Sequence, residues 1–190
     1  MKDFVVSSLK YRPKSFETVI GQNNVTKTLK NSITENKIPS AILFCGPRGV
    51  GKTSCARIYA KEINKSSIDN IDSHDLSFNV FELDAASNRG IEEMKNLIDK
   101  VRVPPQIGKY KVYIIDEVHM LTPQAMNAFL KTLEEPPKHI VFVLATTEKN
   151  KILPTILSRC QIYDFNRINE TEIANALINI CNLSLIHISE

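Results

Sequence analysis

The sequence GPRGVGKT at residues 46–53 decides the fold of this chain. It follows the apolar run AILFC at residues 41–45 and precedes a stretch whose apolar residues recur at helical spacing. A phosphate-binding loop needs this setting, because the strand fixes where the loop starts and the helix N-terminus aims its amide groups at an anion. A glycine-rich turn with a solvated lysine would need neither neighbour. We therefore predict that the loop binds a nucleotide.

Each residue type in the loop has a chemical reason to be there. Gly46, Gly49 and Gly51 allow the backbone to curl so that successive N–H groups face the β-phosphate. Lys52 supplies a positive charge toward the β- and γ-phosphates, and the Thr53 hydroxyl is a ligand for Mg²⁺. The predicted cofactors are therefore ATP and Mg²⁺.

A second chemical signal is the stretch KVYIIDE at residues 111–117, an apolar strand that ends in two carboxylates. Ligands collect at the carboxyl ends of parallel strands, so Asp116 is expected beside the phosphate loop. Asp116 would then hold Mg²⁺, while Glu117, pointing to the other side, would orient and deprotonate the attacking water. The alternative is a strand that simply ends in charged residues.

Apolar patterning along the rest of the chain alternates between helices and short buried strands, which predicts an α/β fold with a parallel sheet covered on both faces. The predicted helices are 23–36, the stretch from the loop to Asn64, 91–101, 123–133 and a helix from Asn169. Asn24 is the predicted cap of the first of these helices, and Glu172 is predicted in a capping box at the start of the last. The predicted strands are 41–45, 79–83, 111–117, 139–145 and 161–165.

Composition excludes several classes of protein. Charged residues make up 24% of the chain and the net charge is +3, which does not by itself require a nucleic-acid partner. No apolar run approaches the roughly 18 residues of a membrane span, and the first residues lack a signal core, so we predict a cytoplasmic protein with no membrane partner. Its four cysteines form no CxxC pair, and His74 lies alone among carboxylates, so we expect no zinc site.

Other segments leave alternatives open. The lead-in arm containing Tyr11 and Arg12 either packs against the core or covers the adenine base. Arg89, at the start of the helix 91–101, is either a solvated charge or a phosphate contact. The threonines that end the strand 139–145 either sense the γ-phosphate or cap the next turn. Arg159 is a solvated charge unless an oligomer presents it to a neighbouring nucleotide.

Several motifs together resemble one family: YRPKSFETVIGQ, GPRGVGKT, ELDAASN, KVYIIDEVHML, FLKTLEEPP, LATTE and LPTILSRCQ. They are similar to the γ/τ subunits of bacterial DNA polymerase III, the ATPase motors of the sliding-clamp loader within the AAA+ class. The resemblance covers about residues 11–165. It implies a three-layer αβα domain at 1–166 with a five-stranded parallel sheet, followed by the truncated start of a helical lid at 167–190.

The resemblance also implies roles for individual residues. Thr147 would be the first sensor residue, with Thr146 as its close competitor, and Arg159 would be an arginine finger reaching into an adjacent subunit. Arg89 and Lys131 fall in segments that contact primer-template DNA in such loaders. The implied partners are the other subunits of a hetero-pentameric loader, the sliding clamp and primed DNA. The family's four-cysteine zinc module is missing from residues 65–77.

The implied function is ATP hydrolysis that drives loading of the clamp during DNA replication. Two alternatives remain, a related AAA+ DNA-processing ATPase and a non-hydrolysing scaffold subunit. A scaffold has no use for the metal and water ligands present here. No paired carboxylates of a two-metal nucleotidyltransferase occur in the sequence, so we expect no DNA polymerase site in this chain, whatever activity the holoenzyme has.

Overall fold

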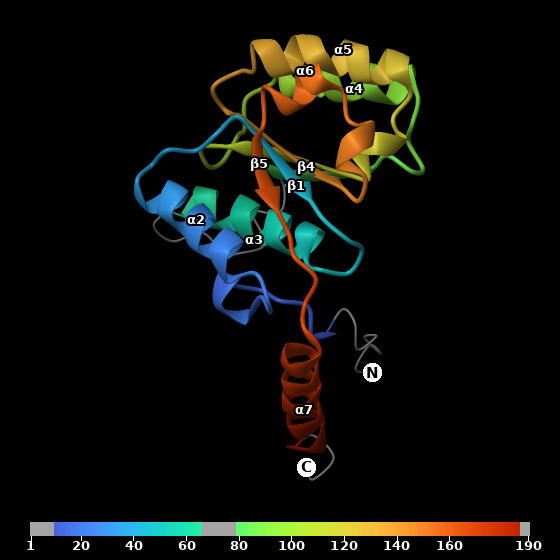
Figure 1. Cartoon of the computed structure of the whole chain (residues 1–190). Coiled ribbons are helices and arrows are strands. Elements are labelled where there is room, and N and C mark those ends of the chain that lie inside the picture. The colour runs from blue at the N-terminus through green and yellow to red at the C-terminus, as the bar shows by residue number, and fades with distance from the viewer. Residues whose placement is uncertain (1–9, 66–78, 187–190) are drawn as a thin grey trace, which may run out of the picture.

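The computed structural model describes residues 10–65 and 79–186 of the 190-residue chain (Figure 1). Its elements are η1 Phe16–Thr18, α2 Asn23–Thr34, β1 Ala41–Cys45, α3 Lys52–Lys65, β2 Val80–Asp84, α4 Ile91–Val101, β3 Lys111–Asp116, η3 Val118–Met120, α5 Pro123–Glu134, β4 Ile140–Thr146, η4 Lys149–Lys151, α6 Pro154–Leu157, β5 Gln161–Asp164 and α7 Glu170–Ile186.

The five strands form one parallel sheet in the order β2-β3-β4-β1-β5. Helices α2 and α3 cover one face of the sheet, and α4, α5 and α6 cover the other (Figure 1). The predicted α/β architecture, with three layers and five parallel strands, is confirmed. Because all strands run the same way, their carboxyl ends meet at one edge of the sheet, where ligands of such folds bind.

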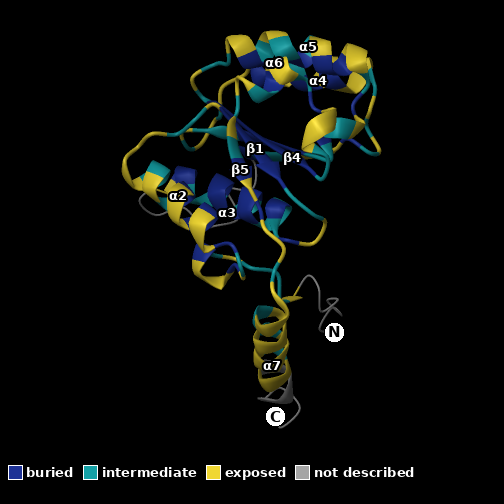
Figure 2. Ribbon diagram, viewed as in Figure 1, coloured by how far each residue is buried: buried dark blue, intermediate teal, exposed yellow. Residues whose placement is uncertain are grey.

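Alternation along the central strands divides the apolar core into two clusters. In β1, Ile42 and Phe44 pack into the cluster that includes residues of α2 and α3, while Leu43 and Cys45 pack into the cluster with residues of α4 and α5. All seven residues of β4 are buried. Strands buried on both faces read as continuous apolar runs, which is why the sequence pattern identified them (Figure 2).

The element boundaries differ from the predictions in two informative places. The strand predicted at 111–117 ends at Asp116, because Glu117 has left-handed backbone angles of φ 48° and ψ 44°. The predicted cap at Asn24 is wrong, since α2 begins at Asn23 with Gln22 before it. Strand β1 has the predicted bounds, and β2, β4 and β5 differ from theirs by one residue at one or both ends, the ordinary uncertainty of such boundaries.

The last helix begins as expected. Asn169 Oδ1 accepts a hydrogen bond of 2.8 Å from the backbone N–H of Glu172, and Glu172 Oε2 accepts one of 3.4 Å from the N–H of Asn169, which together form the predicted capping box. Helix α7 then extends away from the three layers (Figure 1). The division into domains at 166/167 stays a prediction.

Two further predictions concern a possible zinc site and a possible membrane span. The predicted loop 65–77, including His74 and the expected absence of zinc, lies outside the described residues except for Lys65. Within the ranges 10–65 and 79–186, no helix is both long and apolar enough to cross a membrane.

Candidate functional site

The glycine-rich loop connects β1 to α3 at the carboxyl edge of the sheet. Gly46, Gly49 and Gly51 have φ values of 152°, 81° and 96°, a backbone region that residues with a Cβ rarely adopt. At Gly46 the constraint is also steric, because a Cβ there would lie 2.5 Å from the carbonyl oxygen of Phe165. These glycines therefore give the loop the curled backbone predicted for phosphate binding.

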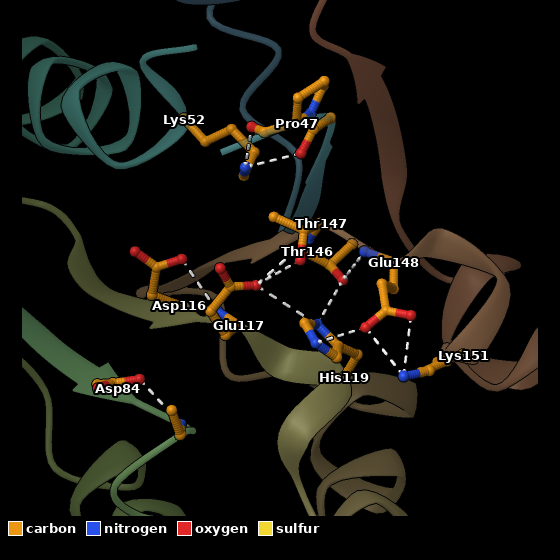
Figure 3. Close-up of polar contacts among 12 residues, drawn as sticks. Pro47, Lys52, Asp84, Asp116, Glu117, His119, Thr146, Thr147, Glu148 and Lys151 are labelled. Carbon is orange, nitrogen blue, oxygen red and sulfur yellow. Dashed lines mark hydrogen bonds and ion pairs between the residues drawn. The ribbon is translucent and has the colours of Figure 1, made fainter. Parts of the chain in front are cut away.

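Lys52 begins α3 and is 6% exposed. Its Nζ donates hydrogen bonds of 2.8 Å to Gly46 O and 2.7 Å to Pro47 O (Figure 3). Burial lowers the pKa of Lys52 from its ordinary value, and the charges of Glu117 and Asp116 oppose that shift. The lysine and the acidic pair therefore act on one another across the same site.

Thr53 and Asp116 meet directly. The Thr53 hydroxyl donates a hydrogen bond of 2.7 Å to Asp116 Oδ2, which joins the start of α3 to the end of β3. A hydroxyl and a carboxylate oxygen are hard ligands of the kind that Mg²⁺ prefers. Because the two oxygens lie 2.7 Å apart, both can reach the same ion.

Glu117 follows in its left-handed conformation, which costs a non-glycine residue about 1–3 kcal/mol. Its N–H donates to Asp116 Oδ1 at 2.9 Å. Its carboxylate Oε2 accepts hydrogen bonds from Thr147, at 3.0 Å from the hydroxyl and 3.3 Å from the backbone N–H (Figure 3). The left-handed turn thus directs the carboxylate to the end of β4.

The two threonines at this strand end have different surroundings. Thr147 contacts Glu117 directly. Thr146 is fully buried, accepts a hydrogen bond of 3.0 Å from the N–H of Glu148 and shares another of 3.0 Å with His119 Nδ1. Of these competing sensor candidates, Thr147 is the one that touches the proposed base.

The phosphate loop, the start of α3 and the acidic pair after β3 contribute to the lining of a cavity of about 830 Å³. Its lining includes Lys52, Thr53, Asp116 and Glu117, together with three arginines, Arg12, Arg48 and Arg57. A nucleoside triphosphate fits a cavity of this size, and the positive side chains complement its charge. Tyr11 is not among the described residues that line the cavity, so the arm contributes Arg12 to it rather than the tyrosine ring.

Sequence reasoning missed two features of this site. Arg57 forms an ion pair with Glu82 of β2, 2.5 Å between Nη2 and Oε2, and both line the cavity. His119 has a side chain only 6% exposed and contacts Glu117 and Glu148. Neither feature has a local sequence signal, because their partners lie on other elements.

Arg159 lies far from this cavity in the fold. It precedes β5, whose Gln161 pairs with Ile42 near the start of β1, so it lies at the amino edge of the sheet, opposite the loop. Its guanidinium donates to Thr155 O at 2.7 Å and to Glu134 Oε1 at 2.8 Å. An arginine here is outside its own chain's nucleotide cavity.

Of the two candidate DNA contacts, Arg89 lies just before α4 and Lys131 lies on the neighbouring helix α5. Arg89 is exposed, precedes α4, and its Nε donates to Ala86 O at 3.1 Å. Glu92 and Glu93 occupy the first turn of α4. Their negative charges make anion binding at this helix start less favourable. Lys131 is exposed in the last turn of α5, beside α4 (Figure 1). Both DNA contacts stay predictions.

A sheet ordered β2-β3-β4-β1-β5, with a phosphate loop after β1 and an acidic pair after β3, defines the AAA+ class of P-loop ATPase folds. Residues 21–169 match the family described as "DNA polymerase III, delta subunit". The chain belongs to that family.

Relatives and solved structures agree with this assignment. The chain is 47% identical over 192 residues to DNA polymerase III subunit tau of Bacillus subtilis, covering 95% of this chain and 34% of that protein. It is 41% identical to subunit tau/gamma of Haemophilus influenzae, covering 93% of this chain and 27% of that protein. The expected resemblance to γ/τ subunits is confirmed, and the chain spans only about a quarter to a third of the length of these two relatives.

Two solved structures from Thermotoga maritima share the fold. The RuvB Holliday junction branch migration motor aligns with a TM-score of 0.67 at 23% identity, over 87% of this chain and 52% of that one. A DNA polymerase III gamma subunit-related protein aligns with a TM-score of 0.59 at 26% identity, over 75% of this chain and 47% of that one.

Proposed function

We propose that this chain is the ATP-binding and ATP-hydrolysing motor of a clamp-loader subunit, acting in DNA replication. The observation that carries the proposal is the convergence of four side chains on one cavity, Lys52 and Thr53 from the start of α3 and Asp116 and Glu117 from the end of β3. Membership of the DNA polymerase III family, and relatives called tau or gamma, support the clamp-loader setting.

The chemistry follows from where these side chains lie. Lys52 and the loop amides bind the triphosphate and offset its charge, and the buried position of Lys52 strengthens that interaction. Thr53 and Asp116 would hold Mg²⁺, which supplies positive charge to the phosphate oxygens. Glu117 takes a proton from water as the water oxygen bonds to the γ-phosphorus, and the bond to the bridging oxygen breaks.

The placement of Arg159 supports action in an assembly. This arginine lies at the edge of the sheet opposite its own cavity, so any role in catalysis requires a neighbouring subunit's nucleotide. We propose other loader subunits as partners on this ground, and the sliding clamp and primed DNA on the ground of the family membership. The two alternatives predict other outcomes. A scaffold subunit would bind ATP without turnover. A different DNA motor, such as the RuvB motor that shares this fold, would not respond to a sliding clamp.

The experiment measures ATP binding and turnover in the protein that contains this chain, assembled with its partner subunits. Lys52→Met should abolish ATP binding. Glu117→Gln should keep binding and lower turnover by about 10²- to 10⁴-fold. Clamp and primed DNA should stimulate the wild type. A turnover that Glu117→Gln leaves at the wild-type level would refute the hydrolytic mechanism, and the absence of stimulation by clamp and primed DNA would refute the clamp-loader assignment.

A further inference from the structure

The proposed mechanism gives no role to His119, a titratable residue whose buried side chain contacts the proposed base, Glu117. It lies in η3, directly after the turn at Glu117, and its side chain is 6% exposed. Two backbone hydrogen bonds hold this turn, from Met120 N to Glu117 O at 2.8 Å and from Leu121 N to Val118 O at 3.2 Å. Because Val118 and Leu121 are buried, the imidazole is fixed in place by the turn.

The imidazole ring lies between two carboxylates from different elements. Its Nδ1 is 3.4 Å from Glu117 Oε2, and its Nε2 is 3.3 Å from Glu148 Oε1 (Figure 3). Nδ1 also shares the hydrogen bond of 3.0 Å with the Thr146 hydroxyl. The histidine therefore joins the turn after β3 to the end of β4 through polar contacts on both ring nitrogens.

The contacts on the Glu117 carboxylate are one-sided. Within the described ranges 10–65 and 79–186, the hydrogen bonds and the ion pair of its carboxylate all fall on Oε2, two hydrogen bonds from Thr147 and the ion pair with His119. A carboxylate held by one oxygen presents the other oxygen in a fixed direction, which is what a base needs to meet a water beside the γ-phosphate.

The far side of the histidine is anchored as well. Lys151 Nζ lies 2.9 Å from each carboxylate oxygen of Glu148. The hydrogen bond from Lys151 lowers the pKa of Glu148, and the charge of His119 acts in the same direction. Glu148 is therefore a carboxylate that stays charged, and its Oε1 holds the Nε2 side of the ring.

We propose that His119 is a positioning residue for Glu117, which holds carboxylate Oε2 through its Nδ1 side while Glu148 fixes the ring from the Nε2 side. This inference rests on the proposed function, since it assigns a role in orienting the base of that reaction. Thr147 alone cannot fix the carboxylate plane, because both of its hydrogen bonds come from one residue on one side.

The test uses substitutions that mimic one ring nitrogen at a time. His119→Ala should lower kcat for ATP hydrolysis by about 10- to 100-fold with little change in KM or ATP affinity, the cost expected of a misplaced catalytic group. His119→Asn places an amide where Nδ1 lies and should recover most of that loss. His119→Gln places its amide nearer the Nε2 position and should recover little.

His139 supplies a matched control. It precedes β4 at the opposite edge of the sheet, half-buried, with Nε2 3.1 Å from Val101 O. His139→Asn should leave kcat unchanged. Equal kcat values for His119→Asn and His119→Gln, or a wild-type kcat for His119→Ala, would overturn the inference even where Glu117→Gln abolishes turnover. If Glu117→Gln does not lower turnover, the proposed function itself fails.

Discussion

The Thr53 hydroxyl donates a hydrogen bond of 2.7 Å to Asp116 Oδ2, although 63 positions separate the two residues. The contact exists because β1 and β3 are parallel strands of one sheet, so the loop after β1 and the acidic end of β3 reach the same edge. The two oxygens that we propose as ligands for one cation are thus brought together by topology rather than by sequence proximity.

Magnesium dependence should therefore follow the Thr53 hydroxyl. Thr53→Val removes one of the two protein oxygens, and we expect turnover at limiting Mg²⁺ to fall by about 10²-fold or more, because the metal contributes several kcal/mol of charge stabilisation. The measurement is ATP turnover against Mg²⁺ concentration. Thr53→Ser keeps the hydroxyl and should stay near wild type; the same Mg²⁺ curve for valine and serine variants would contradict the assignment.

The loop glycines allow a steric prediction. Gly46→Ala should destabilise the fold by about 1–3 kcal/mol beyond the cost of its backbone angle, because the new Cβ would meet Phe165 O at 2.5 Å. Gly49→Ala is the matched control, since its φ is also positive but a Cβ there meets nothing within 4 Å. The free energy of unfolding in urea measures both, and equal losses would show that the clash is relieved.

The sequence predicted the parts of this molecule that local pattern controls. Strands β1 and β4 are buried on both faces, so their apolar runs were visible without any knowledge of their neighbours. The phosphate loop was visible because its glycines meet a local backbone requirement. Asp116 followed from the rule that parallel strands end at a common edge.

Features that depend on distant contacts could not be read in the same way. A histidine two residues after Glu117 resembles any solvated histidine until β4 brings Thr146 and Glu148 against it, from 27 and 29 positions away in the sequence. The left-handed angles of Glu117 likewise occur where its carboxylate contacts Thr147, 30 positions away in the sequence. The sequence placed both Tyr11 and Arg12 in the arm near the nucleotide, but it could not show that Arg12 and not Tyr11 lines the cavity.

Alkaline pH should destabilise the protein through its buried thiols. Burial raises the pKa of Cys55 from its ordinary value of 9.0 to about 12, and the residue is fully buried. A raised folded pKa means that the stabilisation is fully present below pH 9 and is lost as pH rises toward 12, at about 1.4 kcal/mol per pH unit.

The check is the difference in unfolding free energy between wild type and Cys55→Ala at several pH values. Other groups with raised pKa values, among them Cys160 and Tyr113, are common to both proteins, so their titration cancels. The wild-type advantage should be constant below about pH 8 and shrink above pH 9. Two curves that stay parallel up to pH 11 would show that the thiol does not titrate as its burial requires.

Arg159 should matter to a neighbour's nucleotide and not to its own. In the assembled protein, Arg159→Ala should lower ATP turnover by about 10³- to 10⁵-fold with ATP affinity retained, the range known for arginine fingers. Glu134→Gln tests the resting contact, since it removes the ion pair of 2.8 Å while keeping the arginine, and turnover should change little. Unchanged turnover for Arg159→Ala would remove the inter-subunit role.

Mixing two defective subunits distinguishes action across an interface from a structural effect. Arg159→Ala subunits keep Lys52, and Lys52→Met subunits keep Arg159, so neither alone has a complete site if the arginine acts in trans. Co-assembled, an Arg159 from the second type can reach the nucleotide of the first, and partial turnover should return. A structural role for the ion pair with Glu134 predicts no such recovery, because each defect would stay within its own chain.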